Sequence, residues 1–229
     1  MQTSGMEARV IKALEENSLE VFTTRDIRLL AGLSQVQTYN IIKLLKKHGH
    51  IRLVKNGLYY RTGTDEMVVA ARAVYPSYIS FLSALNYYGY SDQTSGKLTI
   101  ATTTKQSHKD YICVHISRSR FFGYTHINNI VIAEREKALI DSLYMPKYSG
   151  GIKEIIKCFR AAKIGKRKIY EYATKMQSRA VMRRLGFVME HVGMPLGKKI
   201  VIGRGYELLE PSNEKKHNYN KKWLLDVNL

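Results

Sequence analysis

The stretch of residues 23–61 constrains the fold more than any other, because it predicts two capped helices and a hairpin in immediate succession. Thr23 and Thr24 can cap a short helix that Gly32 ends, and Ser34 can cap a longer amphipathic helix after a tight turn. The Asn-Gly pair at residues 56–57 lies between alternating apolar runs, which is a strong signal for a hairpin with a type I′ turn. This order of parts predicts a winged helix-turn-helix, with the hairpin as its wing.

The two faces of the second predicted helix differ in chemistry. One face repeats at the i, i+3, i+4, i+7 spacing of a core-facing stripe and consists of Thr38, Ile41, Ile42 and Leu45. The other face consists of Gln35, Gln37, Asn40 and Lys43. In the major groove of DNA, amide side chains pair with adenine and lysine pairs with guanine. We therefore predict that these four polar residues contact bases; a small protein-binding module is the alternative.

Other residues of this motif are expected to contact the DNA backbone. Those predicted to lie at the edge of the motif are Arg25, Arg28, Ser34 and Thr38, with the arginines and Ser34 best placed for phosphates. Those predicted to reach the backbone or the minor groove from the wing are Lys55, Asn56 and Arg61. A helix over residues 6–16 is expected to cover the motif, and residues 2–5 are excluded from the fold.

The charge of the chain favours a polyanionic partner. Lys and Arg number 37 against 19 Asp and Glu, which gives a net charge of +18 and a pI near 9.8. Residues 153–204 alone contain 14 basic and 3 acidic side chains. This excess predicts a second phosphate-contacting surface, for which we select Lys166, Arg167, Lys168, Arg183 and Arg184. An ordinary solvated helix face is the alternative.

The remainder of the chain predicts a mixed α/β domain, so that the whole protein is of the α+β class. The expected domains are a DNA-binding domain over residues 1–63 and a second domain over residues 64–229. Helices are predicted over residues 65–74, 77–88, 134–145, 152–162, 166–176 and 179–192. Strands are predicted over residues 97–103, 111–116, 130–133, 199–202 and 206–209, with a turn at residues 128–129 before the third.

No pattern in the chain indicates a metal, a cofactor or a catalytic centre. Cys113 and His115 are spaced like two zinc ligands, but a structural zinc site needs four ligands. The densest carboxylates, Glu134, Glu136 and Asp141, fall in one predicted helix, where acids near the first turn favour the helix dipole. We therefore predict a protein without enzymatic activity.

The chain also predicts a cytoplasmic protein without a membrane span. Its two cysteines lie far apart and form no disulfide framework, which is typical of a reducing compartment. No apolar run approaches the roughly 18 residues of a membrane span. Trp223 is expected to anchor the C-terminal tail onto its domain.

Five segments resemble the AbiEi family of antitoxins and transcriptional regulators. These are KNGLYYR, YPSYISFLSALNYYGYSD, KLTIATTTKQ, AEREKALIDSLYMP and KKWLLDVN, which occur in this order over nearly the whole chain. The resemblance implies a winged helix joined to a non-enzymatic α/β domain. It also implies an operon shared with a nucleotidyltransferase-like toxin, which need not be contacted directly. Repression of the operon by binding to inverted repeats implies two copies of the protein on each operator.

Three functions are therefore open at the level of sequence. The first is a sequence-specific repressor and antitoxin that binds double-stranded DNA. The second is an orphan winged-helix regulator whose C-terminal domain senses a ligand or a protein partner. The third is an enzyme that acts on nucleic acid.

Overall fold

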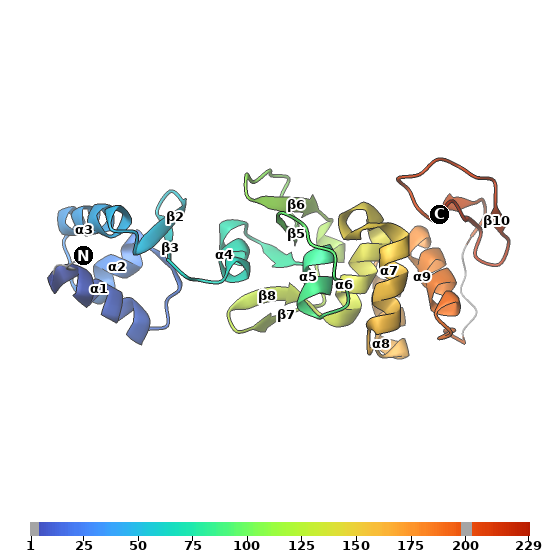
Figure 1. Cartoon of the computed structure of the whole chain (residues 1–229), viewed down its shortest axis with the longest axis horizontal. Coiled ribbons are helices and arrows are strands. Elements are labelled where there is room, and N and C mark those ends of the chain that lie inside the picture. The colour runs from blue at the N-terminus through green and yellow to red at the C-terminus, as the bar shows by residue number, and fades with distance from the viewer. Residues whose placement is uncertain (1–4, 198–202) are drawn as a thin grey trace. The chain divides into compact units, whose positions relative to one another are not determined.

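The computed structural model describes residues 5–197 and 203–229 of an α+β protein (Figure 1). The strand expected at residues 199–202 lies outside the described residues, as do residues 2–4 of the segment that was excluded from the fold. The exclusion of Gly5 is wrong, because a helix begins at this residue. The chain divides into two compact units, Met1–Tyr75 and Pro76–Leu229. Within the described ranges, no helix has both the length and the apolar character needed to cross a bilayer.

The N-terminal unit consists of short helices around a small antiparallel sheet with the strand order β1-β3-β2. Its elements are α1 (Gly5–Glu16), β1 (Val21–Thr23), α2 (Thr24–Ala31), α3 (Gln35–Lys47), β2 (Ile51–Lys55), β3 (Leu58–Arg61) and α4 (Glu66–Ala73). The predicted helices and hairpin are present. The short strand β1 was not predicted; it pairs with β3, opposite Leu58, Tyr59 and Tyr60.

Two capping boxes begin the helices that the sequence patterns predicted. The Thr23 side chain accepts a hydrogen bond from the Asp26 N–H, and the Asp26 carboxylate accepts one from the Thr23 N–H. Ser34 and Gln37 form the same pair at the start of α3. Gly32 ends α2 in the left-handed conformation that the turn requires.

The hairpin turn differs from the predicted type. A type I′ turn needs positive φ at both central residues, but of residues 56–57 only Gly57 has positive φ. The strand register shifts between Leu53 and Lys55, so a bulge supplies part of the bend. At Asn128 and Asn129, by contrast, φ is +46° and +66°, as a type I′ turn requires.

The unit boundary lies later than the predicted division at residues 63–64. Helix α4 packs against β1 and β2, and the Lys55 ammonium donates a hydrogen bond to the Ala73 carbonyl oxygen at 3.1 Å. Residues 64–75 therefore belong to the N-terminal unit. The core of this unit includes Val10, Leu14, Phe22, Ile27, Ile41, Leu45 and Ile51.

The C-terminal unit contains a five-stranded sheet in the order β6-β5-β4-β8-β7. Its strands are β4 (Ser77–Ile79), β5 (Leu98–Thr102), β6 (Tyr111–His115), β7 (Tyr124–Ile127) and β8 (Ile130–Ala133). The predicted helix over residues 77–88 is wrong at its start, because residues 77–79 form the central strand. Helix α5 (Phe81–Tyr87) begins only after Ser80. All three residues of β4 are buried, which removes the alternating pattern that identifies a half-exposed strand.

The helices of this unit pack around α6 (Arg135–Tyr144), which contacts α5, α7, α8 and α9 (Figure 1). The later elements are η2 (Pro146–Ser149), α7 (Gly151–Ala161), α8 (Lys166–Lys175) and α9 (Arg179–His191), and the short η1 (Arg118–Arg120) precedes β7. The predicted helix boundaries agree with these to within one or two residues.

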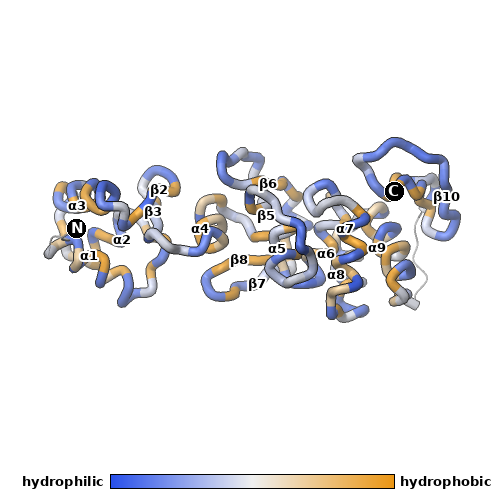
Figure 2. Tube along the Cα trace, in the orientation of Figure 1, coloured by the Kyte–Doolittle hydropathy of each residue, from blue (hydrophilic) through white to orange (hydrophobic). Residues whose placement is uncertain are grey.

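The C-terminal tail forms a small second sheet. Its strands are β9 (Glu207–Leu208), β10 (Tyr219–Asn220) and β11 (Leu225–Asp226), in the order β10-β11-β9. A hydrophilic loop precedes β10, as the blue tube in Figure 2 shows. Trp223 is buried against Gly186 of α9, and its indole N–H donates a hydrogen bond to Glu190 at 2.8 Å. The predicted role of Trp223 as an anchor is confirmed.

Candidate nucleic-acid interface

Helix α3 presents one buried face and one solvent-exposed face. The buried residues are those of the predicted apolar stripe, Thr38, Ile41, Ile42 and Leu45. The residues opposite this stripe, spaced i, i+4, i+7 and i+11, are Val36, Asn40, Lys43 and Lys47. The exposed face therefore combines an apolar side chain, an amide and two ammonium groups along the length of the helix.

The amides predicted to contact bases differ in their availability. Gln35 and Asn40 are exposed, as is Lys43. Gln37 is exposed too, but its side-chain oxygen accepts a hydrogen bond from the Ser34 N–H at 2.9 Å. A bidentate pair with adenine uses both the oxygen and the nitrogen of the amide. The helix cap therefore competes with base pairing at Gln37.

Thr38 does not belong to the exposed face. Its side chain is only 1% exposed, and its hydroxyl donates a hydrogen bond to the Ser34 carbonyl oxygen at 2.8 Å. The prediction that Thr38 lies at the edge of a DNA interface is wrong. Thr38 belongs to the same helix face as Ile41 and Leu45, and this face points into the core. Ser34 is exposed, and its hydroxyl caps α3 through the Gln37 N–H.

Some of the predicted cationic contacts in the N-terminal unit have partners within the unit, and others do not. Arg25, Arg28 and Lys43 are exposed and form no ion pair with any described residue. Arg61 is half-buried and forms an ion pair with Glu15 at 3.1 Å. Lys55 is held by the Ala73 carbonyl oxygen, whereas Asn56 is exposed in the hairpin turn. Among the predicted contact residues, the exposed cations of α2 and α3 therefore lack acidic partners within the described residues, whereas Arg61 of the hairpin is paired.

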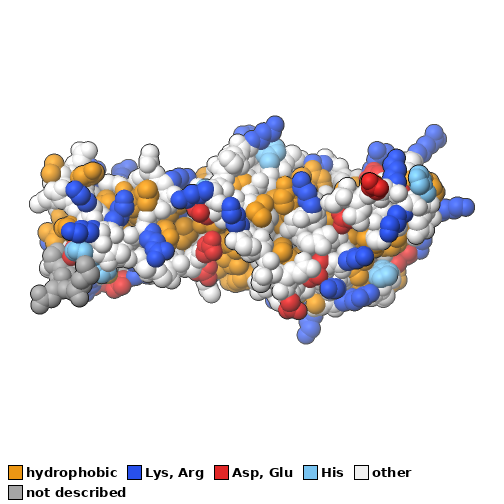
Figure 3. All heavy atoms as spheres, turned by 45° about the horizontal axis from the view of Figure 1, so that its top comes forward, with side chains coloured by type: hydrophobic (Ala, Val, Ile, Leu, Met, Phe, Trp, Pro, Cys, Tyr) orange, Lys and Arg blue, Asp and Glu red, His pale blue; other side chains and the backbone are white. Residues whose placement is uncertain are grey.

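A shallow hollow of about 410 Å³ adjoins the exposed face of α3. It lies between α3 and β3 and is lined by Thr24, Tyr39, Ile42, Lys43, Lys46, Lys47 and Tyr59. Its three lysines have no carboxylate partner among the described residues. Figure 3 shows several Lys and Arg side chains on the visible face of the N-terminal unit. A hollow with this lining suits an anion.

Arg183 and Arg184 do not form the predicted second basic surface. They are 0% and 5% exposed, and their guanidinium groups bind main-chain oxygens inside the C-terminal unit. Arg183 donates to the Arg204 carbonyl oxygen at 3.1 Å. Arg184 donates to Leu143, Leu208 and Leu209 at 2.9–3.0 Å. The selection of these two arginines is wrong, because they join α9 to the end of α6 and to the C-terminal tail.

The three basic residues that begin α8 are exposed, but two of them have acidic partners. Arg167 pairs with Glu171 at 2.8 Å, and Lys168 pairs with Glu134 at 2.7 Å. The hydrogen bond to Glu134 raises the pKa of Lys168. Burial by itself raises the pKa of Glu134, but hydrogen bonds from Lys168 and Tyr172 outweigh burial and lower that pKa. Among the described residues, Lys166 donates a hydrogen bond only to the Pro195 carbonyl oxygen, at 3.3 Å.

A more continuous basic stripe lies on α7 and was not selected from the sequence. Lys153, Lys157 and Arg160 recur at i, i+4 and i+7 on its exposed side, and Lys163 follows the helix. In the described ranges only Lys157 of this set has an acidic partner, Glu154 at 3.3 Å. The signal was present in the sequence, because the predicted stripe of apolar residues leaves these positions on the opposite face.

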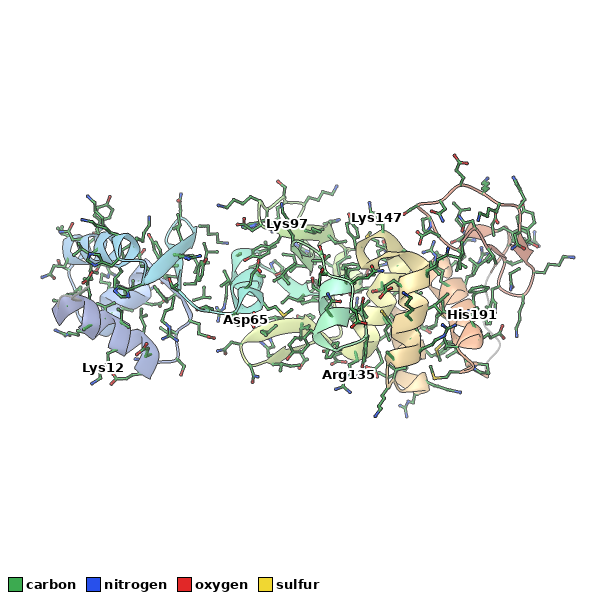
Figure 4. The ribbon with its side chains drawn as sticks, in the orientation of Figure 1. Lys12, Asp65, Lys97, Arg135, Lys147 and His191 are labelled. Atoms are coloured by element: carbon green, nitrogen blue, oxygen red, sulfur yellow. The ribbon has the colours of Figure 1, made fainter. Side chains whose placement is uncertain are left out.

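Lys147 extends the positive charge at the start of α7 (Figure 4). Lys147 and Lys153 line one hollow of about 350 Å³, together with Glu210. The Glu210 carboxylate accepts a hydrogen bond from the Ile152 N–H at 2.8 Å. The first turn of α7 therefore already has an anionic partner from the tail.

The densest carboxylates of the sequence, Glu134, Glu136 and Asp141, do not all face one site. Asp141 is fully buried and accepts hydrogen bonds from Tyr78 at 3.0 Å and Ser80 at 2.8 Å, beside the buried ammonium of Lys137. Burial lowers the pKa of Lys137, and the attraction of Asp141 opposes that change. Glu134 and Glu136 form ion pairs with Lys168. Over the described residues, no three His, Cys, Asp or Glu side chains are grouped to hold a metal ion.

The cysteines are free thiols of different accessibility. Cys113 is half-buried, and burial raises its pKa. Cys158 is fully buried in α7, and burial, together with the nearby Glu154, raises its pKa to about 12. A raised pKa disfavours the thiolate, which is the nucleophilic form, at both positions.

Comparison with known proteins identifies similarity of fold alone. No protein-family model matches the sequence, and a search of curated proteins finds no match. The structure is similar to the crystal structure of the RV2827C protein from Mycobacterium tuberculosis, with a TM-score of 0.73 and 13% sequence identity. The match covers 98% of this chain and 92% of that one. The chain is therefore similar in fold to a solved protein over nearly its whole length.

Proposed function

We propose that the protein is a sequence-specific repressor that binds double-stranded DNA through a winged helix-turn-helix in its N-terminal unit. In this proposal α2 and α3 are the two helices of the motif, and the β2–β3 hairpin is the wing. Helix α3 enters the major groove with its first turns toward the bases. The observation that carries the proposal is the exposed face of α3, which combines hydrogen-bonding groups with cations that have no acidic partner in the part of the chain that the structure describes.

Base and backbone contacts are assigned to different residues of this surface. Gln35, Asn40 and Lys43 contact base edges, and the cap reduces the part played by Gln37. We assign phosphate contacts to Arg25 and Arg28 of α2 and to Lys46 and Lys47, which line the hollow between α3 and β3. The hairpin contributes Asn56, because Lys55 and Arg61 are already bound within the unit.

A second phosphate-contacting surface is assigned to α7 in place of the buried arginines. Lys153, Lys157 and Arg160 lie about 6 Å and 4.5 Å apart along the helix axis. They form a ridge of positive charge that suits the backbone of DNA flanking the operator. Lys166, on α8, is a further candidate.

The biological role that we propose is that of an AbiEi-like antitoxin. The support is the resemblance of five sequence segments to that family. In this role two copies bind the inverted repeats of one operator in the cytoplasm, and the protein needs no cofactor and has no enzymatic activity. The partner gene would encode a nucleotidyltransferase-like toxin, with which direct contact is not required.

The proposal is tested by selecting duplexes from a random library with the purified protein at about 150 mM salt, where non-specific binding is weak. We expect enrichment of one inverted repeat by the wild-type protein. Asn40→Ala should weaken binding to the enriched duplex by about 1–3 kcal/mol and relax selection at one base position. Lys12→Ala, on the exposed side of α1, is the control. Enrichment of no sequence would refute the proposal.

A further inference from the structure

Val36 is an exposed apolar side chain in a line of residues along α3 that is otherwise polar and cationic. It occupies the first turn of α3 and is 71% exposed. Its neighbours along the exposed line of the helix are Asn40, Lys43 and Lys47. Because its side chain is exposed and contributes little to the core, Val36 is available for contact with a partner.

The helix cap at Gln37 leaves Gln35 and Val36 as the side chains of the first turn that are available to contact bases. Gln37 is held to the Ser34 N–H, so the first turn offers the amide of Gln35 and the two methyl groups of Val36. In the major groove, thymine differs from the other bases by its 5-methyl group, which is read by apolar contact. The first turn of α3 therefore has the chemistry to recognise a thymine.

Resting on the proposed function, we infer that Val36 is a specificity-determining residue that contacts the 5-methyl group of a thymine in the operator. The adjoining surface favours DNA over a protein partner. Tyr39, which is 72% exposed, lies beside Lys43 and Lys46 in the hollow, and these lysines have no acidic partner within the described residues. A thymine beside a phosphate backbone satisfies both the apolar and the cationic groups.

The test replaces single thymines by deoxyuridine in the duplex enriched from the random library. This change removes one methyl group and leaves every hydrogen-bonding group of the base in place. For at least one thymine of each half-site, the wild-type protein should bind the uridine duplex about fourfold more weakly, which corresponds to about 0.8 kcal/mol. Val36→Ala should bind the thymine and uridine duplexes equally at that position.

Two measurements separate a lost contact from a lost fold. Alanine is a better helix former than valine, so Val36→Ala should keep the melting temperature of the wild type. Leu44→Ala changes another exposed apolar residue of α3 and should retain the preference for thymine.

The possible results distinguish this inference from the proposed function. Equal binding of thymine and uridine by the wild type at every position overturns the inference alone. A thymine preference that survives in Val36→Ala, or one that Leu44→Ala also abolishes, overturns it as well. Complete loss of binding in a folded Val36→Ala variant contradicts it too, because one methyl contact is worth only about fourfold. If the wild type enriches no duplex, the proposed function and this inference fail together.

Discussion

Replacing Arg184 by methionine is expected to destabilise the C-terminal unit and to leave DNA binding unchanged. The Arg184 guanidinium donates three hydrogen bonds of 2.9–3.0 Å to the carbonyl oxygens of Leu143, Leu208 and Leu209. These bonds join α9 to the last turn of α6 and to β9. Burial lowers the pKa of Arg184, a sign that desolvation opposes the charge.

The magnitude follows from what the substitution leaves behind. Methionine keeps the apolar stem of the side chain but leaves three main-chain acceptors without their donors, at about 1–3 kcal/mol for each that stays dry. Removing the desolvation cost of the buried cation offsets part of this loss. We expect the free energy of unfolding to fall by about 3–5 kcal/mol.

Urea unfolding followed by the fluorescence of Trp223 measures this change. Trp223 is the single tryptophan of the chain and lies in the C-terminal unit, so its signal reports the unit that contains Arg184. Arg160→Met, on the exposed stripe of α7, is the matched control and should change stability by less than about 0.5 kcal/mol. An Arg184→Met variant within about 1 kcal/mol of the wild type would refute the structural role of these hydrogen bonds.

Three further predictions concern other parts of the C-terminal unit. Gly186→Ala should destabilise this unit by about 1–3 kcal/mol and shift the Trp223 emission to longer wavelength, because the new Cβ would collide with the indole ring; an unshifted spectrum would contradict this packing. Replacing both Lys153 and Arg160 by Gln should flatten the dependence of log K on log salt by about 2 if both contact phosphates, and an unchanged slope would remove α7 from the DNA-binding surface. The pKa of Glu134 is lower in the folded state than in the unfolded state. The interactions of its carboxylate therefore stabilise the protein at pH values above the unfolded-state pKa, and this stabilisation is lost as the pH falls through the folded-state pKa. Glu134→Gln should therefore cost up to about 1 kcal/mol at pH 7 and progressively less below about pH 4, and a difference that persists at pH 2 would exclude ionisation as the cause.

Much of the N-terminal unit was predictable because its signals are local. The caps at Thr23 and Ser34, the Gly32 stop and the apolar spacing of α3 each depend on residues a few positions apart. The short strand β1 was not predictable in this way, since it is defined by pairing with β3, far along the chain. The same holds for β4, whose residues are buried on both faces between β5 and β8.

The candidate site was predictable in its helix and less so in its individual residues. Periodicity placed Asn40 and Lys43 on the exposed face, but it did not single out Val36 as the apolar member of that face. It also could not show that the Gln37 amide is engaged by the cap. Arg183 and Arg184 were misassigned because a charged residue is exposed in most proteins, and here the C-terminal tail returns to cover them with main-chain oxygens.

The most direct test of the central claim is a gel-shift and footprint on the region upstream of the gene, against a scrambled duplex of equal length at about 150 mM salt. We predict a protected inverted repeat that is bound many-fold more tightly than the scramble, and a reduction of that difference by about 1–3 kcal/mol in Asn40→Ala. Equal and steeply salt-dependent binding of both duplexes would contradict the claim, because the positive surface would then be a generic polyanion site rather than a reader of sequence.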